Sequence, residues 1–398
     1  MQELVIKQQE DESRIYAILE NGNLVEYYEE KEGQARLEGN IYLGKVVDIL
    51  PGMQAAFVDI GQGKNTFIHI KDILPKENVG KEKEEYQQKQ NDIKKLIKVG
   101  DFLLVQVKRD STNQKGARVS THISLNSRYF VLMPKTDIIT ISQKIENQTE
   151  KERLLSIMKE ILPPNYGVII RTAAQGKKKN DLEQDLIQVL KKWEQVVLNA
   201  EKGKEQKKAV LIEANNDLLE KLLIDTIGSK INKIVVNSKK LKQIVEKKLA
   251  MLSILDSTIK IRIEENISDL YELPKQVEKR KERKVWLKCG GFITIDKTEA
   301  LVAIDVNSGK YTGNQNLEQT VLKVNQEATD EIAKQLRLRD IGGIIIIDYI
   351  DMVEEKHKRE IEERLKEKLK KDRSKTQVIG FTKLNLLEMT RKHMISHE

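Results

Sequence analysis

The sequence predicts an α/β protein with several domains, and three observations lead to that class. The chain has 398 residues, which is enough for roughly two to four domains. Short apolar segments separated by Gly and Pro dominate its first third, as in a small all-β barrel. In its last third, apolar runs alternate with long amphipathic segments, which is typical of strands joined by helices.

We expect residues 1–38 to contribute a strand ribbon that needs a partner from elsewhere in the chain. The segments LVIKQ, RIYAILE and LVEYYEE are apolar or alternating, and turn-forming residues separate them. Such a ribbon is not stable alone. Residues 216–278 mix helical segments with the strand patterns IVVNS and STIKIRI, so we expect them to serve as scaffold and to pair with the ribbon.

Residues 39–125 are predicted to form the β-barrel, and the charged segment 75–98 interrupts it as an insertion. Phe57 and Phe67 fall on neighbouring predicted strands. Exposed aromatic rings among lysines can stack on the bases of a single strand. An isolated Phe more often fills a barrel core, so both interpretations stay open at this point. The lysines expected around the two rings are Lys45, Lys64, Lys108 and Lys115.

Residues 126–215 contain two strand-like segments, SRYFVLMP and YGVIIRTA, and two helical stretches near 148–161 and 180–200. Arg171 and Thr172 follow the second strand. A guanidinium and a hydroxyl at a strand end can grip a phosphate. An Arg-Thr pair by itself is a weak signal for such a site.

Residues 279–398 contain two apolar runs that we expect to be strands, each ending in a carboxylate, Asp305 and Asp348. The run IIIID has the pattern of a strand buried on both faces. The amphipathic helix between the runs predicts a parallel pair, whose carboxyl ends can bring both acids to one hard cation. Asp is also a common turn residue. Asn307 and Asp351 add polar groups at the same two ends, and this density favours a site.

Composition narrows the class of protein. Cys289 is the only cysteine, which excludes a disulfide framework and a cysteine-based zinc site within one chain and fits a reducing cytoplasm. The N-terminus lacks the pattern of a signal peptide, and no run approaches the roughly 20 apolar residues that span a bilayer. The net charge of +8 is compatible with a polyanionic partner. We therefore expect a cytoplasmic protein without a membrane span.

Three segments together resemble the ribonuclease E/G family. They are DVNSG at 305–309, the long run from NLEQTVLKVNQ to IIIIDYIDM, and LLEMTRK near the C-terminus. The resemblance extends from NIYLGKV to the end of the chain, and it is closer to the ribonuclease G branch because no long disordered tail is present. The resemblance implies four parts: an RNase H-like scaffold subdomain over 1–38 and 216–278, an S1-type OB barrel over 39–125, a 5′-sensor subdomain over 126–215 and a DNase I-like catalytic subdomain over 279–398.

The resemblance also implies an activity. It implies a Mg²⁺-dependent endoribonuclease that cuts single-stranded RNA, including rRNA precursors and mRNA, for rRNA processing and mRNA decay. The products would carry 5′-phosphate and 3′-hydroxyl ends, and 5′-monophosphorylated substrates would be favoured.

Family roles carry over to individual positions. Asp305 and Asp348 would be the magnesium ligands, and Asn307 would help hold the scissile phosphate or the metal. Arg171 and Thr172 would grip the 5′-monophosphate. The positions that match RNA-contacting residues of the family's barrel are Phe57, Phe67 and Lys115, which raises the stacking interpretation above the core interpretation.

Two departures from the family pattern affect these expectations. Residue 383 is Lys where ribonuclease E carries Arg, so the positive charge is kept but the bidentate hydrogen bonding of a guanidinium is lost. The Cys-Pro-x-Cys motif that lets two chains share a zinc ion is absent, and His393 and His397 are a poor substitute, so a zinc link is not supported and a homo-oligomer stays open. The competing hypothesis is a non-catalytic RNA-binding scaffold protein of ribosome assembly or of RNA degradation complexes. A weaker one is a DNA nuclease.

Overall fold

The computed structural model describes residues 2–31, 37–74, 92–111, 116–214, 217–226, 231–252, 259–309 and 317–394. The chain divides into two compact units, and each is considered by itself. The first unit contains Met1–Glu32, Lys230–Ala250 and Leu255–His397. The second contains Gly33–Ser229 and Met251–Ile254, together with Glu398. Across the described part of the chain, no helix combines the length and apolar character that crossing a bilayer requires.

A small closed barrel occupies the N-terminal part of the second unit. Its strands follow the order β4-β5-β6-β8-β7, and β4 also pairs with β7, which closes the sheet. Gly44 allows this closure, since a Cβ there would lie 2.5 Å from Val58 Cγ1. The barrel strands are β4 (Ile41–Leu50), β5 (Ala55–Asp59), β6 (Thr66–His69), β7 (Phe102–Arg109) and β8 (Arg118–Ser120), with the helical turns η1 (Pro51–Met53), η2 (Ile70–Asp72) and α2 (Ile93–Leu96) between them.

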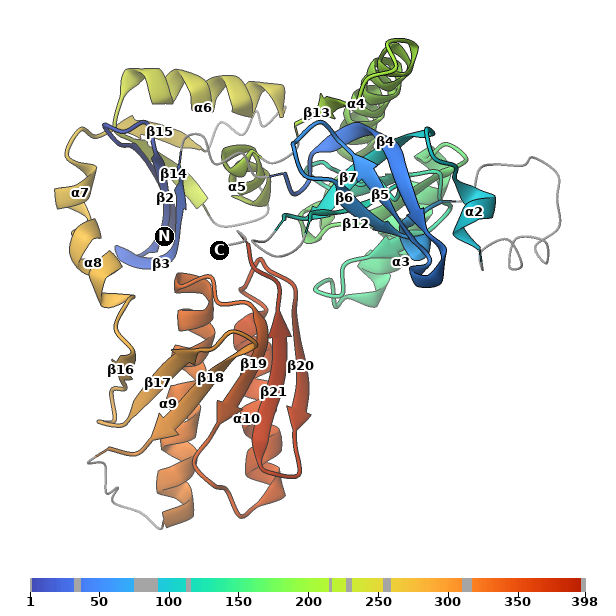
Figure 1. Ribbon diagram of the computed structural model, residues 1–398. Helices are drawn as coiled ribbons and strands as arrows, with labels where there is room; N and C mark the ends of the chain where they lie inside the picture. The colour runs from blue at the N-terminus through green and yellow to red at the C-terminus, as the bar shows by residue number, and fades with distance from the viewer. Residues whose placement is uncertain are drawn as a thin grey trace. The chain divides into compact units, whose positions relative to one another are not determined.

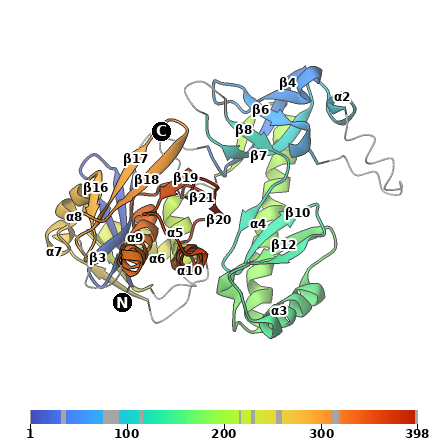
Figure 2. The same ribbon diagram turned by 90° about the horizontal axis from the view of Figure 1, so that it is seen from below.

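The same unit contains a four-stranded sheet with the order β11-β12-β10-β9. The long helix α4 runs beside this sheet (Figure 2), and its Leu182 and Trp193 share one apolar core with Phe130 of β10 and Met158 of α3. The elements are β9 (Leu125–Asn126), β10 (Phe130–Pro134), β11 (Ile139–Ile141), α3 (Gln148–Ile161), β12 (Tyr166–Ile170), η3 (Thr172–Ala174), α4 (Lys179–Glu205), β13 (Val210–Glu213), which pairs with β4, and α5 (Leu218–Thr226).

In the first unit, the N-terminal ribbon finds its partner far along the chain. The five-stranded sheet has the order β15-β14-β1-β2-β3, and β1 pairs in parallel with β14, with Val5 opposite Val235. Both residues are completely buried. The elements are β1 (Gln2–Gln8), β2 (Arg14–Glu20), β3 (Asn23–Glu30), β14 (Ile231–Val236), α6 (Lys239–Met251), β15 (Lys260–Ile263), α7 (Ile267–Leu270) and α8 (Leu273–Lys279).

The C-terminal part of the first unit is a six-stranded mixed sheet with the order β16-β17-β18-β19-β21-β20. Only β18 and β19 pair in parallel, joined by helix α9 as crossover. Helices α9 and α10 lie on the same side of the sheet (Figure 1). The elements are β16 (Lys284–Trp286), β17 (Phe292–Lys297), β18 (Leu301–Asn307), α9 (Leu317–Leu338), β19 (Gly343–Asp348), α10 (Glu355–Leu369), β20 (Thr376–Phe381) and β21 (Leu386–Arg391).

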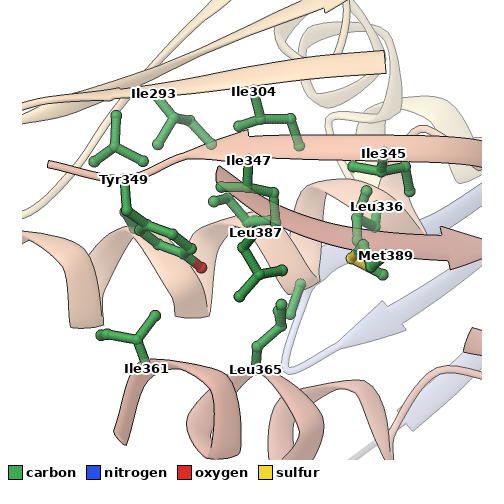
Figure 3. Packing of buried hydrophobic residues seen from close by; sticks show 14 of the residues in the cluster. Ile293, Ile304, Leu336, Ile345, Ile347, Tyr349, Ile361, Leu365, Leu387 and Met389 are labelled. Carbon is green, nitrogen blue, oxygen red and sulfur yellow. The ribbon is translucent and has the colours of Figure 1, made fainter. Parts of the chain in front are cut away.

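The apolar core lies between this sheet and its two helices, so it identifies which side chains of each strand face the helices and which face the opposite side of the sheet. Ile304 and Ile347 point toward the helices and share one apolar core with Ile361 and Leu365 of α10 (Figure 3). Because side chains alternate along a strand, every second residue of β18 and β19 lies on the opposite face. We call that face, which α9 and α10 do not cover, the open face.

The prediction that IIIID is buried on both faces is wrong. Ile345 and Ile347 are fully buried, but Ile344 is 52% exposed. The two helices cover one side of the sheet only, so alternate isoleucines belong to the open face. The strand is therefore apolar on both sides but packed on one.

Candidate active site

Asp305 and Asp348 lie directly opposite each other on the open face. The parallel pairing of β18 with β19 sets Asp305 against Asp348, one register step beyond Ile304 and Ile347. Asp348 ends its strand as expected, whereas Asp305 lies two residues before the end of β18. Both side chains are exposed. Register partners share a face, so two carboxylates far apart in the sequence become neighbours.

Asn307 belongs to the same group. Its Nδ2 donates a hydrogen bond of 2.6 Å to Oδ2 of Asp305. The two residues are two positions apart on β18, which places both on the open face. A carboxamide that donates through Nδ2 still has Oδ1 as a possible oxygen ligand. Asn307 therefore orients the Asp305 carboxylate and adds a neutral oxygen beside that carboxylate.

Electrostatic repulsion is built into this end of the sheet. Burial raises the pKa of the Asp348 carboxyl, and the negative charges of Asp305 and Asp351 raise that pKa further. Among the described residues, no lysine or arginine forms an ion pair with Asp305 or Asp348. A cation between the two carboxylates would relieve the repulsion that raises the pKa of Asp348.

The donor set fits Mg²⁺. Within the described residues there is no group of three or more His, Cys, Asp or Glu side chains that could hold a metal ion by themselves. Mg²⁺ is usually bound through one or two carboxylates, with water and substrate phosphate oxygens filling the other positions. Asp305 and Asp348 supply such a pair, and Asn307 can add an oxygen.

A buried asparagine, which the sequence pattern did not single out, positions the loop after β19. Asn325 of α9 is completely buried. Its Nδ2 donates to the carbonyl of Ile350 at 2.8 Å, and its Oδ1 accepts from the Ile350 N–H at 3.1 Å. Ile350 lies between Asp348 and Asp351, so these bonds fix the backbone that carries both acids. The only signal in the sequence was an amide on the apolar side of an amphipathic helix.

A second clamp holds the next part of this loop. Glu318, in the first turn of α9, accepts hydrogen bonds of 3.3 Å from the N–H groups of Val353 and Glu354, and it lies 2.7 Å from Nδ1 of His357. The hydrogen bond with His357 lowers the pKa of Glu318, and the two backbone N–H groups lower it further.

Asp351 is connected to the turn between β20 and β21. Nδ2 of Asn385 donates to Asp351 at 3.4 Å, and Lys358 Nζ donates to Oδ1 of Asn385 at 3.0 Å. Such contacts between distant segments leave no pattern in the sequence. Lys383 lies exposed in the same turn.

The two phenylalanines of the barrel lie side by side. Phe57 and Phe67 are register partners on β5 and β6, and their ring centroids are 6.3 Å apart at 72°. Each is half-buried, and neither belongs to the barrel core. Lys45 and Lys64 are exposed. Lys115 lies outside the described residues.

Arg171 and Thr172 follow strand β12 in the second unit. Nη1 of Arg171 donates to the carbonyl of Ser127 at 2.9 Å. The hydroxyl of Thr172 lies 3.2 Å from that of Ser142. The Arg171 guanidinium is thus bonded to a backbone carbonyl, and the Thr172 hydroxyl is paired with that of Ser142.

His393 is engaged inside the first unit. Its Nδ1 lies 2.8 Å from the carbonyl oxygen of Asp340, and its ring packs against Gly342. His397 lies outside the described residues.

Comparisons with known proteins match both units. A model of the Ribonuclease E/G family matches residues 124–394, and a model of the S1 RNA binding domain matches residues 37–121. The chain is 39% identical to ribonuclease G of Salmonella typhimurium (strain SL1344) and to ribonuclease G of Escherichia coli (strain K12), covering 98% of this chain and 79% of each relative. It is 34% identical to ribonuclease E of Escherichia coli (strain K12), covering 98% of this chain and 37% of that protein.

Proposed function

Because the chain belongs to the ribonuclease E/G family and is an endoribonuclease, we propose that it cleaves single-stranded RNA in a Mg²⁺-dependent reaction at Asp305 and Asp348. The observation that carries this proposal is the register of β18 and β19, which sets these two exposed carboxylates against each other. An S1 RNA binding domain in the same chain supports RNA as the ligand.

Each residue of the site has a defined task in this proposal. Asp305 and Asp348 hold the cation, and Asn307 orients Asp305 and offers an oxygen to the metal or a donor to the scissile phosphate. Bound Mg²⁺ supplies positive charge that polarises a phosphoryl oxygen, favours a hydroxide nucleophile over water, or does both. Asn325 and Glu318 keep the loop beside Asp348 in place before RNA binds. The proposed products carry 5′-phosphate and 3′-hydroxyl ends.

The barrel would hold the RNA by stacking. Phe57 and Phe67 lie outside the apolar core, where their rings can meet unpaired bases. Exposed lysines such as Lys45 and Lys64 would neutralise phosphates, so RNA affinity should fall as salt rises. Lys115 is proposed as a further RNA contact.

Arg171 and Thr172 would bind a 5′-monophosphate. The proposal rests on the family resemblance and on the hydroxyl of Ser142 beside Thr172. Arg171→Lys keeps the charge and removes the fork, so it should reduce the preference for 5′-monophosphate over 5′-hydroxyl RNA. Equal cleavage of both RNAs by the unaltered protein would exclude a sensor at Arg171.

The wider setting follows from the family and from composition. We propose rRNA precursors and mRNA as substrates, with roles in rRNA processing and mRNA decay, in the cytoplasm. The subdomain assignments are kept as proposals: an RNase H-like scaffold over 1–38 and 216–278, a 5′ sensor over 126–215 and a DNase I-like catalytic part over 279–398.

The deciding experiment measures cleavage and binding separately. A short single-stranded RNA is incubated with the protein and Mg²⁺ or EDTA, and binding is followed by fluorescence anisotropy in EDTA. Asp305→Asn and Asp348→Asn should abolish cleavage and leave RNA affinity unchanged or slightly higher. Asp269→Asn, an exposed acid on α7, is the matched control and should cleave normally.

Three outcomes would overturn the assignment. Cleavage that survives both active-site substitutions would place the chemistry elsewhere. Equal cleavage of a DNA oligonucleotide of the same sequence would favour the DNA nuclease hypothesis. A non-catalytic RNA-binding scaffold would cleave under no condition.

A further inference from the structure

Strand β16, at the edge of the catalytic sheet, presents a tryptophan on the open face. Val285 packs against the core that contains Ile293, so the alternating residues Lys284 and Trp286 point to the other side. The Trp286 side chain is 62% exposed. At this exposure the ring is accessible to a ligand.

Trp286 forms a compact group with Phe292 and Lys284, which we call the aromatic cluster. Trp286 and Phe292 are register partners, and their ring centroids are 5.3 Å apart at 61°. The Nζ atom of Lys284 lies 4.0 Å from the Trp286 centroid and 3.6 Å from the Phe292 centroid. The three side chains thus hold one another in a defined arrangement.

The cluster carries a positive charge that no described carboxylate neutralises. Lys284 forms no ion pair with any described residue. The contrast is its neighbour Arg283, whose Nη2 lies 2.7 Å from Oδ2 of Asp296. A cation held against two rings, without an acidic partner, suits a polyanion that also carries flat bases.

The register connects the cluster with the candidate active site. Phe292 is the partner of Asn307 across β17 and β18, and Lys284 is the partner of Thr294, which in turn faces Asp305. Neighbouring strands are about 4.8 Å apart, so Phe292 lies about 5 Å and Trp286 about 10 Å from Asn307 across the sheet. A nucleotide next to the cleaved bond can reach that far.

We propose that the aromatic cluster is a stacking subsite for an unpaired RNA base beside the scissile phosphate, with Lys284 attracting the adjoining phosphate. The proposal rests on the proposed cleavage at Asp305 and Asp348, and it adds a requirement for a single-stranded nucleotide at one position of the substrate. Stacking selects for unpaired bases because a base in a duplex already stacks on its neighbours.

Binding can be tested without cleavage through the fluorescence of Trp286. The chain has two tryptophans, and Trp193→Phe leaves Trp286 as the only one. In EDTA, single-stranded RNA should quench Trp286 fluorescence, and a duplex of the same sequence should not. An abasic residue at one position next to the cleavage site should remove most of the quenching.

Kinetics give a second and independent test. Trp286→Ala should raise KM for single-stranded RNA about tenfold, within the range measured for single stacking contacts. Trp286→Tyr should restore most of the loss, because a ring is retained. Leu270→Ala, which truncates another exposed apolar side chain of the same unit, should leave KM unchanged.

The outcomes separate this proposal from the proposed function. If Asp348→Asn abolishes cleavage while Trp286→Ala leaves KM unchanged and RNA does not quench Trp286, the stacking subsite is wrong and the active site stands. If Trp286 is quenched but cleavage survives Asp348→Asn, the active-site assignment is wrong and the cluster is still an RNA contact. If Trp286→Ala instead converts a dimer to a monomer and leaves KM unchanged, the cluster is an interface between copies of this chain, and the proposal falls.

Discussion

The Asp348→Asn variant should be more stable than wild type without metal and less stable than wild type when Mg²⁺ is added. Without metal, wild type keeps two carboxylates on neighbouring strands, about 4.8 Å apart. Two unit charges at about 5 Å repel by about 0.8 kcal/mol in water, and salt reduces this further. The amide removes that repulsion and keeps the side-chain volume. The variant should therefore be more stable than wild type in EDTA, by up to about 0.8 kcal/mol.

Magnesium should act in the opposite direction. A ligand at ten times its Kd stabilises the folded state by about 1.4 kcal/mol. For a unit of roughly 200 residues this corresponds to a rise in Tm of roughly 3–5 °C. Wild type should gain this stability, and Asp348→Asn should gain almost none because one of its two anionic ligands is missing.

Differential scanning fluorimetry in EDTA and in a Mg²⁺ series measures both effects. Asp269→Asn controls for the loss of one negative charge and should follow wild type in its response to Mg²⁺. A Mg²⁺-induced rise in Tm that is equal in Asp348→Asn and wild type would refute a metal site between these carboxylates.

Three further predictions address other parts of the molecule. The pKa of Asp348 is raised, so cleavage should be lost as pH falls through that pKa. Asp351→Asn removes a negative charge that raises the Asp348 pKa. It should therefore move the acid limb of the pH–rate profile to lower pH. An unmoved limb would contradict the coupling. Phe57→Ala should weaken RNA binding by about 1–3 kcal/mol in anisotropy titrations with little change in Tm, because the ring lies outside the core. A large fall in Tm would instead show that the Phe57 ring stabilises the barrel. Asn325→Ala should lower the free energy of unfolding measured in urea by about 2–4 kcal/mol, since it leaves the N–H and carbonyl of Ile350 without their buried partner. The kcat for RNA cleavage should fall as well. A variant that is destabilised but fully active would show that cleavage does not require this anchor of the loop.

Sequence periodicity was sufficient for most of the individual elements. The alternation in LVAIDVN places Val302, Ile304 and Val306 in the core, and it therefore places Asp305 and Asn307 on the other face. This inference needs only the period of a strand and the preference of apolar side chains for the interior. Patterns of this kind are local, so they can be read from a few consecutive residues.

Burial on the second face of β19 could not be predicted in the same way. Ile344 is as apolar as its neighbours, yet it is exposed, because exposure depends on whether another element covers that side of the sheet. The same limit applies to Asn325, whose partner Ile350 is 25 residues away. An amide on the apolar side of a helix indicates a buried hydrogen bond but not the group that receives it.

The sequence by itself determined the apolar strands of the C-terminal part, the amphipathic helix between two of them, and the acids Asp305 and Asp348 that these two strands carry. Only the tertiary structure decided that Asp305 faces Asp348 and that Phe292 faces Asn307. The physical reason is that register between strands is set by the packing of the whole sheet and its crossover helix. A shift of one residue would preserve every local propensity and still separate the two carboxylates.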